Sequence, residues 1–145
     1  MKFNFPKSER LTQVKIIDSL FQKDSQTVHN RFVYPFRVLY RASSSEIQSQ
    51  TPQIIISVPK RKFKKAVDRN LIKRRIREAY RLTKPHFEGE GFAVLPSYIG
   101  FVYIGSTIEP YELIKKRMES ILKEFSTVKW CVQRKKNTIY LLAYS

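Results

Sequence analysis

Hydrophobic residues recur at spacings of three and four in three segments of the chain, and each segment is predicted to form a helix. The first helix spans residues 12–22, and Thr12 can cap it. The second spans residues 67–84. The third spans residues 110–125, because Pro110 suits a first helical turn. The apolar positions of the three helices are, in order, Val14, Ile17, Leu20 and Phe21; Ile72, Ile76, Ala79, Tyr80 and Thr83; and Ile114, Met118, Ile121, Leu122 and Phe125.

Three further segments have the composition of strands. Residues 32–41 are rich in aromatic and β-branched side chains, and Pro35 within them indicates an edge position or a bulge. Residues 53–58 form a short apolar run that stops at a proline, and residues 101–105 form another. The resulting order is helix, strand, strand, helix, strand, helix. It predicts an α/β (α+β) two-layer sandwich built on a small sheet.

Composition narrows the class of protein. The 145 residues include 42% hydrophobic side chains, which is enough for the core of one domain, and their formal net charge is +16. A single cysteine excludes an internal disulfide and a cysteine-built zinc site. No apolar run has the length of a membrane span, and the N-terminal residues lack the apolar stretch of a signal peptide. We therefore expect a soluble intracellular protein that binds a polyanion, with nucleic acid favoured over an acidic membrane surface.

The positive charge is concentrated in and before the second predicted helix. Residues 59–84 contain twelve basic side chains and only two acids, Asp68 and Glu78, so this stretch carries +10 of the net +16. At 100° per residue, the polar arc beside the apolar one consists of Asn70, Lys73, Arg74, Arg77, Arg81 and Lys84. An ordinary solvated helix face mixes acids with bases at spacings of three and four. The near absence of acids here favours nucleic-acid binding.

The two acids have structural interpretations. Asp68 is placed to cap the basic helix, and Glu78 can pair with Arg74, Arg75 or Arg81. The remaining reactive side chains form no catalytic set by spacing. His29 and His86 are expected at the surface, and Cys131 is expected to act as a small hydrophobe.

The segment KAVDRNLIKRRIREAYR, residues 65–81, resembles the signature AVxRNRxKRxxRE of the bacterial ribonuclease P protein component. Leu71 departs from it, because the family usually has a second arginine there. Residues 5–11 and 56–61 are also similar to the family. The resemblance covers residues 3–125. The matching signature positions are Ala66, Val67, Arg69, Asn70, Ile72, Lys73, Arg74, Arg77 and Glu78.

The resemblance divides the chain into a family domain, residues 1–126, and a C-terminal extension, residues 127–145. Within the domain, residues 87–100 give no clear pattern and look like an insertion. The extension either adds a strand at 138–144 or is loosely held. For the fold, the resemblance implies a small mixed sheet with a left-handed crossover into the basic helix, similar to the second domain of ribosomal protein S5.

For function, the resemblance implies the accessory protein subunit of an endoribonuclease. One such protein would bind one catalytic ribonuclease P RNA in the cytoplasm, away from membranes. Together they would remove the 5′ leader of precursor tRNA. In this family the RNA carries the chemistry, with Mg²⁺ bound mainly by the RNA, so no catalytic residue or metal ligand is expected in the protein. The RNA-binding candidates are Lys60, Arg61, Lys65, Arg69, Asn70, Lys73, Arg74, Arg77 and Arg81.

A cleft between the sheet and the first helix would hold the single-stranded leader, which needs aromatic stacking surfaces. The candidates are Ile17, Phe21, Tyr34 and Phe36, with core packing as the alternative for the strand aromatics. Ile17 stands where the family often has phenylalanine. Two other functions remain open from composition: a ribosomal or architectural protein that binds RNA or DNA without catalysis, and a peripheral membrane protein.

Overall fold

The computed structural model describes residues 5–22, 28–41, 52–84, 98–127, 129–135 and 138–144. A 3-10 helix, η1, opens this part of the chain at Lys7–Glu9. The elements that follow are α1 (Val14–Phe21), β1 (His29–Val33), β2 (Phe36–Arg41), β3 (Gln53–Ser57), α2 (Ala66–Thr83), β4 (Tyr98–Tyr103), α4 (Tyr111–Thr127), β5 (Lys129–Lys135) and β6 (Thr138–Tyr144).

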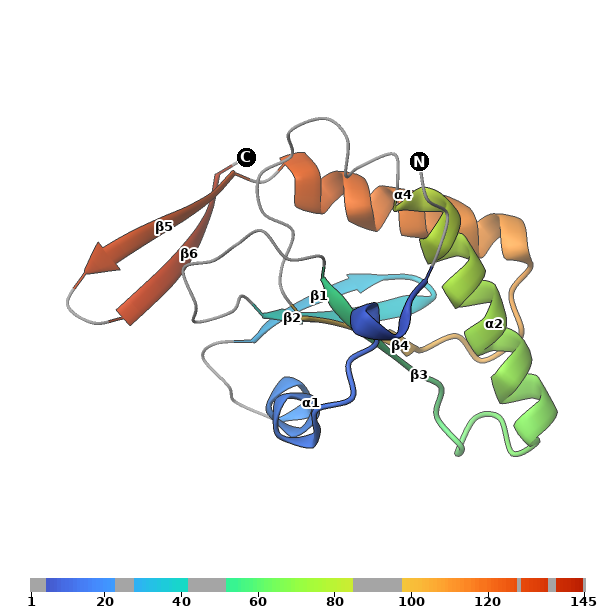
Figure 1. Cartoon of the computed structure of the whole chain (residues 1–145). Coiled ribbons are helices and arrows are strands. Elements are labelled where there is room, and N and C mark those ends of the chain that lie inside the picture. The colour runs from blue at the N-terminus through green and yellow to red at the C-terminus, as the bar shows by residue number, and fades with distance from the viewer. Residues whose placement is uncertain are drawn as a thin grey trace.

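Four strands form a mixed sheet in the order β1-β2-β4-β3. The β1–β2 and β2–β4 pairs are antiparallel, whereas β3 and β4 are parallel. A parallel pair needs a crossover connection, and α2 lies within the one between β3 and β4. Helices α2 and α4 cover one face of the sheet, and α1 lies against the other (Figure 1). The predicted α+β class with a mixed sheet is confirmed.

The core lies between the sheet and the layer formed by α2 and α4. The five apolar positions predicted for the basic helix are all buried, and so are the five predicted for the last helix. The sheet supplies aromatic rings to the same core: Phe101 packs edge-on against Phe36 and also contacts Tyr80 of α2. The 3.6-residue period of these two helices therefore identified their buried faces correctly.

Residues 32–41 are not one strand, as predicted, but parts of two. Strands β1 and β2 form a hairpin in which Val33 pairs with Phe36, and Tyr34 and Pro35 make the turn between them through a cis peptide bond. Proline has no backbone N–H to donate to a ladder and its φ is fixed, so a turn position suits it. The predicted edge or bulge role of Pro35 is wrong.

Two predicted helix caps are corrected, and α1 is less buried than its pattern suggests. The N-cap of α1 is Gln13 and not Thr12, and only Leu20 of its four predicted apolar positions is buried. Val14 and Phe21 are exposed and Ile17 is partly exposed, so much of the apolar side of this helix remains accessible. The N-cap of α2 is Lys65; Asp68 lies in the first turn, where a carboxylate still faces the positive end of the helix dipole.

Strand β4 begins at Tyr98, earlier than predicted, so residues 98–100 belong to the sheet. The rest of the expected insertion and His86 lie outside the described residues. In the C-terminal extension, residues 138–144 do form a strand, and it pairs with β5 in a separate antiparallel hairpin.

Lys84 is buried, although it was predicted on the charged arc of the basic helix. Its exposed fraction is 5%, and its Nζ lies 2.5 Å from Oε1 of Glu9, which is 6% exposed. This ion pair ties η1 to the C-terminal end of α2. Beside it, the Leu11 N–H donates to the Ile54 carbonyl at 2.9 Å, so the N-terminal segment is also held against the outer strand β3.

We predict that Lys84→Met lowers the free energy of unfolding by about 3–5 kcal/mol, because it leaves the Glu9 carboxylate buried without its partner. Denaturant unfolding measures this. The matched control is Arg74→Met, which removes an exposed cation from the same helix and is expected to change stability by about 0.5 kcal/mol or less. A double variant, Glu9→Leu with Lys84→Met, is expected to recover most of the loss. Equal losses of stability in Lys84→Met and Arg74→Met would contradict this account.

Candidate nucleic-acid interface

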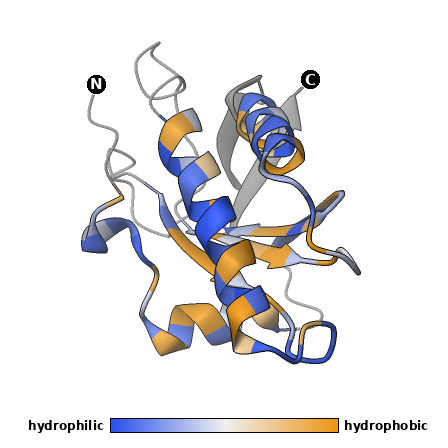
Figure 2. Cartoon of the chain, turned by 90° about the vertical axis from the view of Figure 1, so that its right-hand side faces the viewer, coloured by the Kyte–Doolittle hydropathy of each residue, from blue (hydrophilic) through white to orange (hydrophobic). Residues whose placement is uncertain are grey.

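The side of α2 that faces away from the core carries cations and one amide. Asn70, Arg74 and Arg77 are exposed, and Lys73 is partly exposed. Figure 2 shows hydrophilic residues along much of this helix. The buried strip of α2 fixes the rotation of the helix, so the cations are held in one direction.

The segment before α2 extends this charged face. Residues 59–65, here called the basic turn, connect β3 to α2. Lys60, Arg61 and Lys65 are exposed in it, while Phe63 is buried and its ring lies 5.7 Å from that of Tyr103. The buried ring anchors the basic turn to the core. The predicted RNA-binding residues of the turn and of α2 are thus neighbours on one continuous stretch of the chain.

Other basic residues of this stretch donate hydrogen bonds to backbone carbonyls of the protein itself. The guanidinium of Arg75 donates to the Glu109 carbonyl at 2.7 Å, and Lys62 donates to the Ile104 carbonyl at 2.5 Å. Arg69 donates through Nη1 to the Phe63 and Lys64 carbonyls, at 2.8 and 2.9 Å. The basic residues of 59–84 therefore fall into two groups. Some are exposed without such contacts, and others, including Arg69, donate hydrogen bonds to backbone carbonyls.

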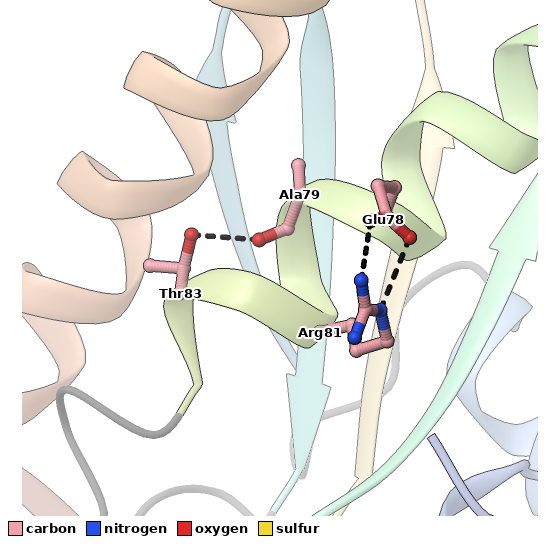
Figure 3. A network of polar contacts seen from close by, with 4 residues as sticks. All are labelled: Glu78, Ala79, Arg81 and Thr83. Carbon is pink, nitrogen blue, oxygen red and sulfur yellow. Dashed lines mark hydrogen bonds and ion pairs between the residues drawn. The ribbon is translucent and has the colours of Figure 1, made fainter. Parts of the chain in front are cut away.

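Glu78 pairs with Arg81, one of the three partners that its position predicted. Arg81 donates through Nε and Nη2 to the two carboxylate oxygens, at 3.1 and 2.5 Å (Figure 3). These hydrogen bonds hold the pKa of Glu78 below its usual range and raise the pKa of Arg81. In the same turn, the Thr83 hydroxyl donates to the Ala79 carbonyl at 2.6 Å (Figure 3). The carboxylate thus neutralises Arg81, at the C-terminal end of the charged face.

A second polar surface lies on the face of the sheet toward α1. Residues paired directly across antiparallel strands share a face, so Asn30 and Phe32 of β1 lie with Leu39 and Arg37 of β2. The Arg37 guanidinium lies over the Phe32 ring, 5.8 Å from its centroid, and donates to Oδ1 of Asn30 at 2.9 Å. The Phe32 side chain is 68% exposed. It is therefore an accessible aromatic ring with a cation beside it.

The same surface has a second arginine over an aromatic ring. Arg41 of β2 lies 5.8 Å from the centroid of the Tyr98 ring and donates to the Ser19 hydroxyl of α1 at 2.7 Å. This hydrogen bond links α1 to the sheet. Sequence reasoning did not select Arg37, Arg41 or Tyr98. Side chains alternate between the two faces of a strand, but this alternation assigns residues to a face only when the position of the hairpin turn is known.

The predicted leader-cleft residues are divided by the structure. Ile17 and Phe21 lie one turn apart on α1, and Phe21 is 42% exposed. Phe36 is fully buried between Phe101 and Tyr103, so its ring is a core group and its assignment to the cleft is wrong. The physical reason is the hairpin turn, which places Phe32 and Phe36 on opposite faces of the sheet.

Tyr34 lies in the hairpin turn and is exposed. Its hydroxyl donates to Oε1 of Glu109 at 2.7 Å, a residue of the loop before α4 and not of α1. That hydrogen bond raises the pKa of Tyr34. His29, expected at the surface, is partly exposed at the start of β1 and stacks on Tyr40, with ring centroids 5.3 Å apart. The aromatic residues of the hairpin therefore differ in environment. Phe36 lies in the core, Phe32 and Tyr34 are exposed, and His29 stacks on Tyr40.

Within the described ranges, no three His, Cys, Asp or Glu side chains are grouped so that they could hold a metal ion. The described part of the chain also contains no helix that is long and apolar enough to cross a membrane.

Comparison with known proteins identifies the family. The sequence model of the Ribonuclease P family matches residues 5–126. The ribonuclease P protein component of Porphyromonas gingivalis is 34% identical over 122 residues, which cover 83% of this chain and 85% of that protein. The protein component of Petrotoga mobilis is 36% identical over 93 residues, 63% of this chain and 71% of the relative.

The fold and the site define a class of protein: a small α+β domain with a mixed sheet and a helix whose outward side is basic. This chain belongs to the ribonuclease P protein family, as the resemblance of residues 65–81 predicted. The matched region begins before η1 and ends within α4. It therefore contains the basic turn, α2 and the sheet surface beside α1.

The two faces of the hairpin predict effects of very different size for two similar substitutions. Phe36→Ala is expected to lower the free energy of unfolding by about 3–5 kcal/mol, because it empties a core position. Phe32→Ala is expected to change it by about 0.5 kcal/mol or less, because the ring is mainly solvated. Thermal or denaturant unfolding of both variants measures the difference. A large loss with Phe32→Ala would contradict the register described here.

Proposed function

We propose that this protein is the accessory subunit of ribonuclease P, an endoribonuclease that removes the 5′ leader from precursor tRNA. It binds the RNA subunit through the outward side of α2 and the basic turn, and it contacts the leader through the surface between α1 and the sheet. The observation that carries the proposal is the charged face of α2, held outward by a fully buried apolar strip in a chain of this family.

The charged face suits an RNA backbone. The planar guanidinium groups of Arg74 and Arg77 can each donate two hydrogen bonds to one phosphate. Asn70, between them and the basic turn, can donate to a ribose or a base edge and also accept from it. If about six phosphates are contacted, the logarithm of the association constant falls with the logarithm of salt concentration with a slope of about −4 to −5.

The surface beside α1 suits a single strand. Single-stranded nucleic acid is held by cations that follow the backbone and by aromatic rings on which bases stack. Phe21 of α1 and Phe32 of β1 are accessible rings, and Arg37 and Arg41 are the cations of the same surface. We propose these four residues, with Ile17, as the contacts to the leader.

The protein binds and positions, and the RNA subunit carries the chemistry. When bound, mainly by the RNA, Mg²⁺ would supply activation of the attacking water and stabilisation of the leaving oxygen in phosphodiester hydrolysis. The outward cations of α2 neutralise phosphates that would otherwise repel each other when the RNA and the precursor approach. One protein per RNA and action in the cytoplasm are parts of the same proposal.

The decisive experiment is a reconstitution with a bacterial ribonuclease P RNA and a precursor tRNA at low millimolar Mg²⁺. RNA alone is expected to be nearly inactive there, because phosphate repulsion is then poorly screened. Addition of the protein is expected to give a 5′-matured tRNA, which gel analysis of labelled precursor detects. Tight RNA binding without any stimulation of cleavage would contradict the proposal and favour a ribosomal or architectural RNA-binding protein of similar fold. Flotation with anionic liposomes tests the membrane alternative separately.

Substitutions on the two surfaces are expected to have separable effects. Arg74→Ala and Arg77→Ala should each weaken binding of the RNA subunit and reduce the magnitude of the salt slope by about one. Phe21→Ala should leave that affinity unchanged and weaken the preference of the holoenzyme for precursor over mature tRNA, because stacking is worth about 1–3 kcal/mol per base. Lys116→Ala, which removes an exposed cation from α4, is the charge-matched control. Equal effects of Arg74→Ala and Lys116→Ala would contradict the assignment of α2.

A further inference from the structure

Arg69 differs from the other predicted RNA-binding arginines in what it contacts. Its Nη1 donates to two backbone carbonyls, at 2.8 Å to Phe63 and 2.9 Å to Lys64. Both acceptors belong to the basic turn. Arg69 is the fourth residue of α2, and helical side chains lean toward the N-terminus, so a long side chain at this position reaches back over the segment that precedes the helix.

We propose that Arg69 is a positioning residue that holds the basic turn in the conformation that presents Lys60, Arg61 and Lys65 to the RNA, in place of a direct phosphate contact. The inference rests on the proposed RNA binding and assigns a different role to one residue of the predicted set. Nη1 of an arginine carries two hydrogens, which matches its two acceptors, the Phe63 and Lys64 carbonyls.

The other contacts of the basic turn show why this role matters. The Phe63 ring is anchored in the core, the Phe63 N–H donates to the Pro59 carbonyl at 3.3 Å, and Lys62 reaches the Ile104 carbonyl. These contacts hold the middle of the turn. The Phe63 and Lys64 carbonyls lie between that middle and the start of α2, and Arg69 is the side chain that ties them to the helix.

The role predicts that losing Arg69 removes more than one RNA contact. Arg74→Ala is the matched comparison, because it removes one arginine from the same helix and leaves the basic turn intact. Arg74→Ala should reduce the magnitude of the salt slope of RNA binding by about one, and Arg69→Ala by about two to three. In a protein that already carries Lys60→Ala and Arg61→Ala, the fold-loss of RNA affinity caused by Arg69→Ala should be about tenfold smaller than in the wild-type protein. The fold-loss caused by Arg74→Ala should be the same in both.

Hydrogen exchange on the free protein provides a readout that does not depend on RNA. Arg69→Ala should accelerate exchange of the backbone amides of residues 61–65, and leave the amides of β4 and the second half of α2 protected. Arg69→Lys keeps the charge but lacks the planar guanidinium, so faster exchange in the turn is expected there too, with the core still folded. Arg74→Ala should leave the exchange of the turn unchanged.

The outcomes separate this proposal from the proposed function. If Arg69→Ala leaves exchange of the basic turn unchanged, and its affinity loss adds to that of Lys60→Ala and Arg61→Ala, Arg69 is an ordinary phosphate contact and the inference is overturned. If the wild-type protein fails to bind the ribonuclease P RNA, the proposed function fails, and the exchange data still decide whether Arg69 holds the turn.

Discussion

The burial of one apolar strip of α2 is the interaction on which the rest of this protein depends. Ile72 and Ile76 are fully buried against the sheet, and each contributes about 1.5–3 kcal/mol relative to an exposed side chain. Like charges at spacings of three and four on the opposite side, such as Lys73 with Arg77, cost only about 0.2–0.5 kcal/mol per pair. Burial therefore outweighs repulsion, and a strongly basic helix can be held in place with only Asp68 and Glu78 as acids along it.

The rigidity of that helix determines how charge is distributed around it. Because α2 cannot rotate, cations on its flanks are directed either outward or toward neighbouring loops. Arg75 and Lys62 fasten the segment between β4 and α4, while Lys84 fastens η1 through a buried ion pair. These inward contacts keep the surroundings of the outward cations fixed. The protein thus uses some of its positive charge to orient the remainder.

The hairpin of β1 and β2 makes the second surface. Its turn at Tyr34 and Pro35 reverses the chain, so that β1 extends the sheet beyond β2 and adds Phe32 and Asn30 to the face beside α1. Arginines over aromatic rings then form a surface that is neither a dry core nor a simple solvated face. Two polar surfaces of different character, one on α2 and one on the sheet face beside α1, result from one sheet with helices on both sides.

The sequence by itself determined the family, the basic helix and the buried faces of α2 and α4. These are local properties: a helical period and a signature of adjacent residues do not depend on distant partners. The tertiary structure decided which cations face outward. Lys84 lies among the polar residues on a helical wheel but meets Glu9 of η1, whereas Arg69, at the edge of the apolar arc, meets carbonyls of the basic turn. It also decided which aromatic rings are accessible. One turn at Pro35 set the strand register, and register fixes on which face of a sheet every side chain lies.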